Sequence, residues 1–283
     1  ENRNPIPEEL PSLSEIIRKG CPYEYRYYLN GCVFTYSTKY WKWDRWEREI
    51  DWMALNGVNL VLVNDPGGAM RNVLARYGIK EQDEARNFFV DQCVELQQKI
   101  IRRMLELGIQ PVLPGFTGYV PNTVREAIKT AEFIDGGIWC GHPKQPYIKL
   151  GDPLFNEFGK IFYEEQKKLY GEQKFITASP VGEGTPPEGY SFSDAGKQIQ
   201  DLIFDAFPGV TWVLGGWQDN PRPELLEKAD KDRTLILDLW GETRPQWKRA
   251  DRFDLYRQTP WIWNIINNFG GNNGLECNNE TWK

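Results

Sequence analysis

The sequence predicts an α/β fold, a TIM-type (β/α)8 barrel in which seven strands can be recognised along the chain. Short apolar runs alternate with amphipathic helical patterns, as in βα units that build a parallel sheet, and 283 residues suit one such barrel. Hydrophobic residues make up 40% of the chain, enough for a globular core. A closed barrel has eight strands, so either a strand is missed within 135–150, or the last strand lies beyond Lys283, or another chain covers an open edge.

The elements follow one another as a lead-in segment, residues 1–25, and a barrel, residues 26–283. The lead-in is polar and rich in proline. Strands are predicted at the apolar runs 27–34, 58–64, 109–116, 174–179, 210–217, 234–240 and 261–268. Helices are predicted near 42–56, 68–77, 90–107, 122–133, 153–170, 191–206, 222–229 and 244–257, where apolar residues recur at helical spacing.

The composition argues against several classes of protein. Lys and Arg total 34 against 40 Asp and Glu, a net charge of −6, whereas a nucleic-acid partner requires a basic face. The single histidine, His142, excludes a zinc site built from several histidines. The five cysteines show no CxxC spacing, and their odd number leaves at least one thiol free within a single chain. No apolar run reaches eighteen residues, so we expect no membrane span, and the sequence implies no cofactor and no metal.

The carboxyl ends of parallel strands are where a barrel carries its functional side chains. Glu183 and Glu242 stand just past two predicted strands, and Trp217, Trp240 and Trp263 are expected at the same rim. Two carboxylates beside aromatic faces suit glycoside hydrolysis, since one protonates the leaving oxygen while the other attacks the anomeric carbon or activates water. The alternative is that these are ordinary surface glutamates and core tryptophans.

One glycine pair could suggest a different ligand. Gly67-Gly68 follows the second predicted strand and is similar to a phosphate-cradling loop, but the fuller GxGxxG spacing is absent. A plain turn from strand to helix is the favoured interpretation.

Several segments resemble one enzyme family. They are Tyr27-Tyr28-Leu29-Asn30, the run WKWDRWEREIDWMALNG at 41–57, PVLPGF at 111–116, Pro186-Pro187, Gly216-Trp217, Leu237-Asp238-Leu239 and NFGGN at 268–272. Together they resemble the α-N-acetylglucosaminidases, glycoside hydrolase family 89, over about residues 20–276. The resemblance implies a barrel that removes terminal α-linked N-acetylglucosamine, or a related sugar, with retention of configuration. It also implies a carbohydrate substrate and a secreted or lysosomal location.

The resemblance also implies roles for particular residues. Glu183, in Val181-Gly182-Glu183-Gly184, stands at the position of the family acid/base, and Glu242, in Leu239-Trp240-Gly241-Glu242, at that of the nucleophile. Candidates for sugar contacts, by family position and strand-end location, are Asn30, Cys32, Trp217, Trp263 and Asn268.

The chain departs from the family pattern at the rim. Tyr119 replaces a usual His, Gly215 a usual Gln, and Asn264 a usual Cys. Two alternatives therefore stay open beside the hydrolase. One is a carbohydrate-binding relative without turnover. The other is a structural or assembly subunit, as a homo-oligomer or with a partner chain, that uses an open barrel edge.

Overall fold

The computed structural model describes residues 9, 12, 20–80, 83–183, 186–241, 244–249 and 253–264. Its centre is a sheet of seven parallel strands that follow one another around the sheet in chain order. These strands are β1 (Tyr27–Tyr28), β2 (Leu60–Leu62), β3 (Gln110–Pro114), β8 (Phe175–Thr177), β9 (Thr211–Gly216), β10 (Thr234–Asp238) and β11 (Trp261–Trp263). The predicted TIM-type barrel is confirmed, with these seven strands in the part of the chain that the structure describes.

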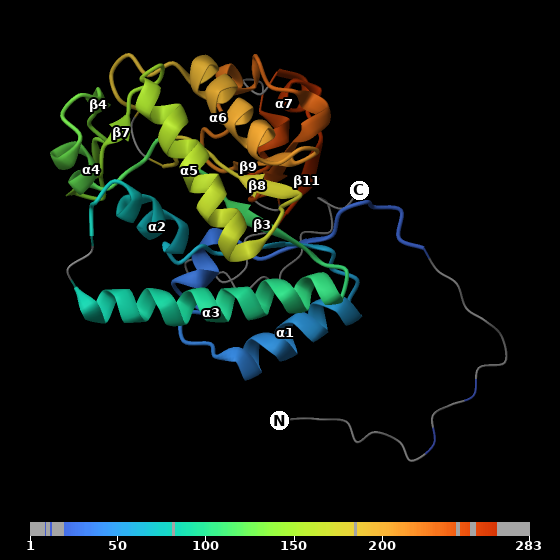
Figure 1. Cartoon of the computed structure of the whole chain (residues 1–283). Helices are drawn as coiled ribbons and strands as arrows, with labels where there is room; N and C mark the ends of the chain where they lie inside the picture. Colours follow the sequence, from blue (N-terminus) through green and yellow to red (C-terminus); the bar gives the residue numbers. More distant parts are fainter. Residues whose placement is uncertain are drawn as a thin grey trace.

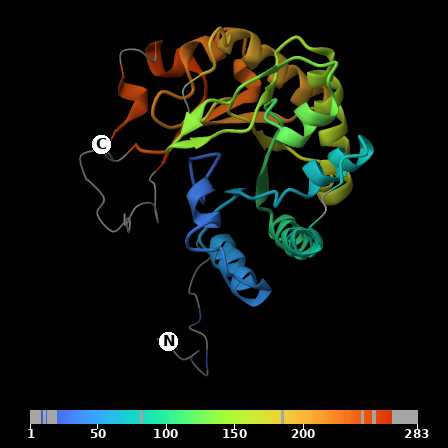
Figure 2. The ribbon, with the colours of Figure 1, turned by 90° about the vertical axis from the view of Figure 1, so that its left-hand side faces the viewer.

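Helices cover the outer side of this sheet (Figures 1 and 2). They are α1 (Trp43–Leu55), α2 (Gly68–Arg76), α3 (Glu84–Glu106), α4 (Asn122–Ala127), α5 (Pro153–Tyr170), α6 (Phe192–Ala206) and α7 (Phe253–Gln258). Shorter 3-10 turns are η1 (Gly31–Phe34), η2 (Pro223–Leu226), η3 (Lys231–Arg233) and η4 (Gln246–Lys248). Three long helices, α3, α5 and α6, begin after a capping residue whose side-chain oxygen accepts a backbone N–H of the first turn. The capping residues are Asp83, Asp152 and Ser191.

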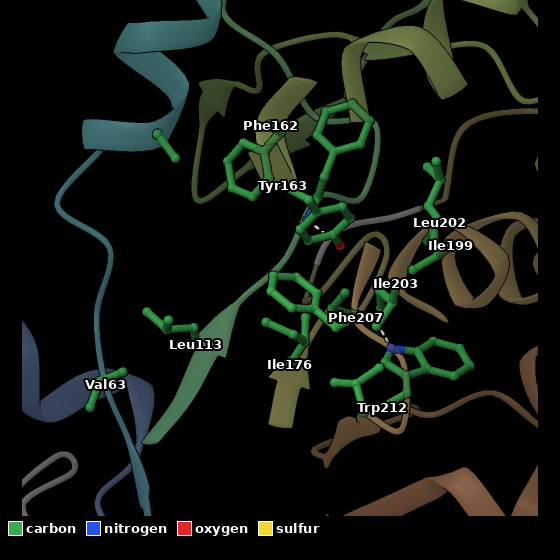
Figure 3. Close-up of a cluster of buried hydrophobic side chains, with 14 of the residues drawn as sticks. Val63, Leu113, Phe162, Tyr163, Ile176, Ile199, Leu202, Ile203, Phe207 and Trp212 are labelled. Atoms are coloured by element: carbon green, nitrogen blue, oxygen red, sulfur yellow. Dashed lines mark hydrogen bonds between the residues drawn. The ribbon is translucent and has the colours of Figure 1, made fainter. Parts of the chain in front are cut away.

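The core has two layers because side chains alternate between the two faces of each strand. In β9, Trp212 and Leu214 face the helices and belong to the large outer cluster, which Figure 3 shows in part. Val213 faces the barrel interior, where it packs in a second cluster with residues such as Val112 and Leu235. The same alternation decides which residues past the strand ends can face the barrel axis.

Several predicted elements differ from the observed ones. The first strand was expected to run to residue 34, but only Tyr27–Tyr28 is strand, because Leu29 has a φ of 71° and Gly31–Phe34 turns into η1. The helix expected from residue 90 begins at Glu84, capped by Asp83. The helices expected at 122–133, 222–229 and 244–257 are shorter or broken into α4, η2, η4 and α7. Residues 265–268 of the last predicted strand lie outside the described residues.

Residues 135–150 do not supply the eighth barrel strand. They hold three of four short strands, β4 (Phe133–Ile134) with β7 (Tyr147–Ile148) and β5 (Ile138–Trp139) with β6 (His142–Pro143), in two antiparallel pairs outside the barrel sheet. Within the described residues, the sheet ends at β1 on one side and β11 on the other. Residues from both edge strands line a cavity of about 880 Å³. A second copy or partner chain at this edge stays a prediction, as does the division at residue 25.

Candidate active site

The turn after β8 carries Glu183 to the carboxyl-end rim of the barrel. The Glu183 side chain is bound at both oxygens: the Trp217 indole Nε1 donates to Oε1 at 2.6 Å, and the Trp139 indole Nε1 donates to Oε2 at 3.1 Å. Val181 and Gly182, just before it, have φ values of 69° and 56°, in the left-handed region. Asn220 Nδ2 donates to the Gly182 carbonyl at 2.7 Å. The rim therefore presents one carboxylate held by donors from two other elements.

Trp217 links Glu183 to the end of the next strand. It follows β9 directly, and its ring stacks on that of Trp240 with centroids 4.7 Å apart and planes 22° apart. Trp240 comes two residues after β10, and the Arg244 guanidinium lies over the Trp240 ring, 4.6 Å from its centroid. The predicted meeting of Glu183 with Trp217 and Trp240 at one rim is thus observed.

Asn30 and Cys32 approach the same rim from the end of β1. Asn30 is buried, and its Oδ1 accepts the Cys32 backbone N–H at 3.0 Å, which starts η1. Burial raises the pKa of the Cys32 thiol, and the negative charge of Glu183 raises it further. A contact of either residue with a sugar stays a prediction.

The turn that leads to Glu242 is anchored by Asp238, the last residue of β10. This buried carboxylate accepts the backbone N–H of Trp247 at 2.9 Å and the hydroxyl of Tyr256 at 3.0 Å. Burial raises the pKa of Asp238, although these donors oppose the shift. Gly241 N–H donates to the Asn264 carbonyl at 2.9 Å, which ties the turn to the end of β11.

Three more of the site residues predicted from sequence are Trp263, Glu242 and Asn268. Trp263 packs against Gly241, on the face of β11 opposite to Ile262, which packs on the interior cluster. Glu242 and Asn268 lie outside the described residues. Their proposed roles, and that of Trp263, stay predictions.

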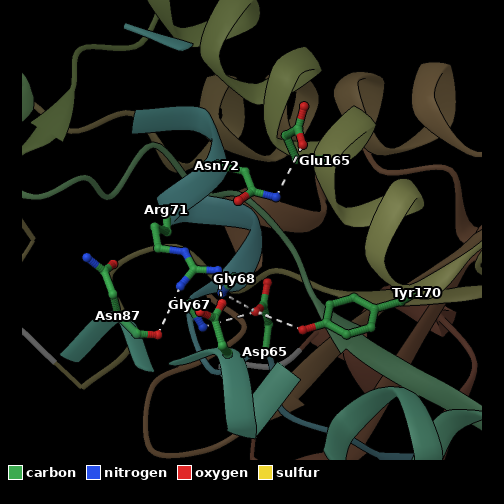
Figure 4. A network of polar contacts seen from close by, with 9 residues as sticks. Asp65, Gly67, Gly68, Arg71, Asn72, Asn87, Glu165 and Tyr170 are labelled. Atoms are coloured by element: carbon green, nitrogen blue, oxygen red, sulfur yellow. Dashed lines mark hydrogen bonds and ion pairs between the residues drawn. The ribbon is translucent and has the colours of Figure 1, made fainter. Parts of the chain in front are cut away.

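The glycine pair after β2 forms a turn from strand to helix (Figure 4). The Asp65 carboxylate accepts the N–H groups of Gly67 and Gly68 at 3.0 Å each and the Tyr170 hydroxyl at 3.3 Å. A Cβ on Gly68 would lie 2.6 Å from Val94 Cγ2, so glycine lets helix α2 pack closely. Because the two N–H groups already bond Asp65, the similarity to a phosphate loop does not hold.

Sequence reasoning missed Trp139 and Lys144, which the β5–β6 hairpin brings to Glu183. Lys144 Nζ donates to the Val181 carbonyl at 3.1 Å, and burial lowers the pKa of its amino group. A rule based on barrel strand ends could not find them, since they precede α5 on an inserted hairpin. The available signal was the exposed apolar pair Ile138-Trp139 between Gly136-Gly137 and Gly141, a typical hairpin context.

Neither a metal centre nor a membrane span is found in the part of the chain that the structure describes. No group of three His, Cys, Asp or Glu side chains there could hold a metal ion, and no helix there is long and apolar enough to cross a membrane. Cys21, Cys32, Cys93 and Cys140 are free thiols, and Cys277 lies outside the described residues.

Comparison with known proteins agrees with this arrangement. The family model of the α-N-acetylglucosaminidase (NAGLU) TIM-barrel domain matches residues 26–93 and 82–283. The chain belongs to this family. Human α-N-acetylglucosaminidase is 30% identical over 311 residues, which are 95% of this chain and 41% of the human protein. The resemblance stated from sequence motifs is therefore confirmed.

Solved structures of the family have the same fold. A family 89 glycoside hydrolase from Clostridium perfringens, in complex with PUGNAc, superimposes with a TM-score of 0.85 at 33% identity, over 94% of this chain and 33% of that one. A variant of the clostridial enzyme with two glutamates replaced by glutamine, in complex with its substrate GlcNAc-α-1,4-galactose, gives 0.83 at 33% identity, again over 94% and 33%. The chain thus spans less than half the length of these relatives.

The departures from the family pattern can be read in the structure. Tyr119 meets Tyr147 edge-on with ring centroids 5.2 Å apart, and its hydroxyl accepts the Gln145 N–H at 3.1 Å. A Cβ on Gly215 would lie 3.5 Å from Leu239 Cδ1, an ordinary contact distance, so the position has room for a side chain. Asn264 serves the Gly241 turn through its backbone. These positions therefore take part in packing or leave space at the rim.

Proposed function

We propose that this chain is a retaining glycoside hydrolase that cleaves terminal α-linked N-acetylglucosamine or a related sugar. Glu183 is its acid/base and Glu242 its nucleophile. In the first step Glu183 protonates the glycosidic oxygen while Glu242 attacks the anomeric carbon, and a glycosyl-enzyme forms as the leaving alcohol departs. In the second step Glu183 takes a proton from water, which attacks that carbon and releases Glu242.

The placement of Glu183 is the observation that carries the proposal. Its carboxylate stands past the carboxyl end of a barrel strand, between Trp139 and Trp217, which both donate to it. The stacked pair Trp217 and Trp240 adds aromatic surface of the kind on which the apolar face of a sugar packs. Glu242 follows β10, two strands further around the same sheet.

The relatives support the same assignment. The human relative is an α-N-acetylglucosaminidase, and the clostridial one was captured with an α-linked N-acetylglucosaminyl disaccharide after two glutamates became glutamines. Two glutamates are what the retaining mechanism requires. By this family membership we also propose a secreted or lysosomal location.

The test is hydrolysis of a nitrophenyl α-N-acetylglucosaminide by the protein and by its Glu242→Gln and Glu183→Gln variants. Loss of a nucleophile should lower kcat by at least 10³-fold, since the covalent step is lost. NMR of the first product should show the α-anomer, as retention requires. Glu188→Gln is the matched control, because Glu188 is an exposed carboxylate on the same loop; it should keep full activity.

The other outcomes distinguish the alternatives. Binding of N-acetylglucosamine by a folded protein without turnover would favour the carbohydrate-binding relative. Neither binding nor turnover, together with a concentration-dependent oligomer, would favour the assembly subunit. Release of the β-anomer would refute retention while leaving the hydrolase in place.

A further inference from the structure

The β5–β6 hairpin reaches Glu183 from outside the barrel sheet. Its strands pair with Trp139 opposite His142, and the Lys144 N–H donates to the Gly137 carbonyl at 2.8 Å at its base. Trp139 is 49% exposed, yet its indole N–H donates to Glu183 Oε2 at 3.1 Å. A large aromatic side chain is thus kept half in solvent while its single polar group is directed at the carboxylate.

The two indoles that bond Glu183 divide its oxygens between them. Trp217, stacked on Trp240, takes Oε1, and Trp139 takes Oε2. An indole N–H is a donor only, so each bond needs a lone pair of one carboxylate oxygen in a fixed direction. A glutamate on an exposed turn would otherwise sample several rotamers. Two donors from different elements remove that freedom.

The hairpin is joined to the Glu183 turn a second time through the backbone. Lys144 Nζ donates to the Val181 carbonyl at 3.1 Å, two residues before Glu183. A Cβ on Gly136 would lie 2.1 Å from the Gln145 carbonyl oxygen, so the two arms of the hairpin approach closely at that point. The Trp139 indole therefore holds the Glu183 side chain, and the Lys144 ammonium holds the backbone of the same turn, both from this one hairpin.

We infer that Trp139 is a positioning residue for Glu183, which fixes the carboxyl group in the orientation that proton transfer to the glycosidic oxygen needs. This inference rests on the function proposed above. Trp217 bonds Oε1 at 2.6 Å and Trp139 bonds Oε2 at 3.1 Å, so the two indoles together fix the direction of both carboxyl oxygens. The β5–β6 hairpin is therefore part of the active site, although it lies outside the strand ends of the barrel sheet.

The first test is the Trp139→Phe variant, which keeps most of the aromatic surface and loses the N–H. With an α-linked N-acetylglucosaminyl disaccharide, whose leaving alcohol must be protonated, kcat/KM should fall about tenfold, the worth of one hydrogen bond to a charged group. A second substrate is a dinitrophenyl α-N-acetylglucosaminide, whose leaving group departs as an anion and needs no protonation. With this dinitrophenyl glycoside, kcat/KM should stay within twofold of that of the unchanged protein. Ile138→Ala is the matched control on the same hairpin, and it should leave both substrates within twofold.

The kinetic pattern separates positioning from a merely structural role. A loose hairpin or a lost sugar contact would lower kcat/KM equally for both substrates, and that result overturns the inference. An unchanged rate with the disaccharide overturns it too. With the dinitrophenyl glycoside, kcat and KM should fall together, because Glu183 also assists the second step, and azide, which needs no base, should restore kcat.

A second measurement does not depend on turnover. In protein labelled with ¹⁵N at tryptophan, the Trp139 indole resonance is assigned by its absence in Trp139→Phe. It should move upfield in Glu183→Gln, which removes the charged acceptor, and stay in place in Glu188→Gln. A resonance that ignores Glu183→Gln overturns the inference even in an active enzyme. If the protein hydrolyses neither substrate but the Trp139 resonance still moves in Glu183→Gln, the proposed function is refuted while the contact between Trp139 and Glu183 stands.

Discussion

A methyl group added at Gly241 should damage the site far more than the same methyl group added at Gly215. On Gly241 a Cβ would lie 2.6 Å from two atoms of the Trp263 indole and 3.0 Å from the Asn264 carbonyl oxygen. That oxygen accepts the N–H of Gly241 itself, so it cannot move away without loss of the bond. On Gly215 the nearest atom, Leu239 Cδ1, would be 3.5 Å away, an ordinary contact.

The expected size follows from how the clash can relax. Overpacking of this kind costs about 1–3 kcal/mol of folding free energy when the neighbours must move. The backbone that moves is the one that leads directly to Glu242, the proposed nucleophile. A misplacement of about 1 Å at a reacting group lowers the rate by about 10²-fold. Gly241→Ala should therefore lose about two orders of magnitude in kcat while remaining folded at 25 °C.

The assay is kcat with the nitrophenyl glycoside, together with urea unfolding of both variants. Gly215→Ala should keep kcat within about threefold, since a methyl group at ordinary contact distance disturbs little, and its stability should change by less than about 0.5 kcal/mol. Equal activities of the two variants, or a larger loss in Gly215→Ala, would refute the argument that the Gly241 turn positions Glu242.

Two further predictions concern stability. Trp212→Phe removes two buried ring carbons, worth about 0.8 kcal/mol each, and the 3.0 Å hydrogen bond from Nε1 to the Ala178 carbonyl, worth about 1 kcal/mol. Urea unfolding should show that the free energy of unfolding falls by about 3 kcal/mol, and a fall of less than about 1 kcal/mol would contradict this prediction. Burial opposes ionisation of Glu165, but the nearby Lys168 and Arg76 outweigh this effect and lower the pKa of the Glu165 carboxyl. Glu165→Gln should therefore lower the free energy of unfolding by about 1 kcal/mol at pH 7. In urea unfolding at lower pH, this difference from the unchanged protein should vanish as the pH falls through the pKa of folded Glu165.

The order of the barrel strands could be predicted from sequence because each buried strand is a short apolar run next to a helical pattern. The ends were harder to predict, as β1 shows. Its apolar run continues to Phe34, but the positive φ of Leu29 and the cap from Asn30 turn the chain into η1. The two-residue strands between Phe133 and Ile148 are too short to show any periodicity.

The candidate site could be predicted only where it follows barrel strands. Glu183 and Trp217 stand past β8 and β9, so one rule about strand ends found both. Trp139 lies on a hairpin whose distance from the rim in three dimensions depends on tertiary packing. Its bond to Glu183 joins residues 44 positions apart, and no local pattern encodes such a contact.

The backbone before Glu183 is strained, and side chains from other elements hold it in place. Val181 has a φ of 69°, which is costly for a β-branched residue, on the order of 1–3 kcal/mol. Such strain persists only where the surroundings enforce it, and here Lys144 and Asn220 hold the carbonyls of Val181 and Gly182. The position of the Glu183 carboxylate therefore depends on the hairpin and on the loop after β9, whose side chains hold this turn.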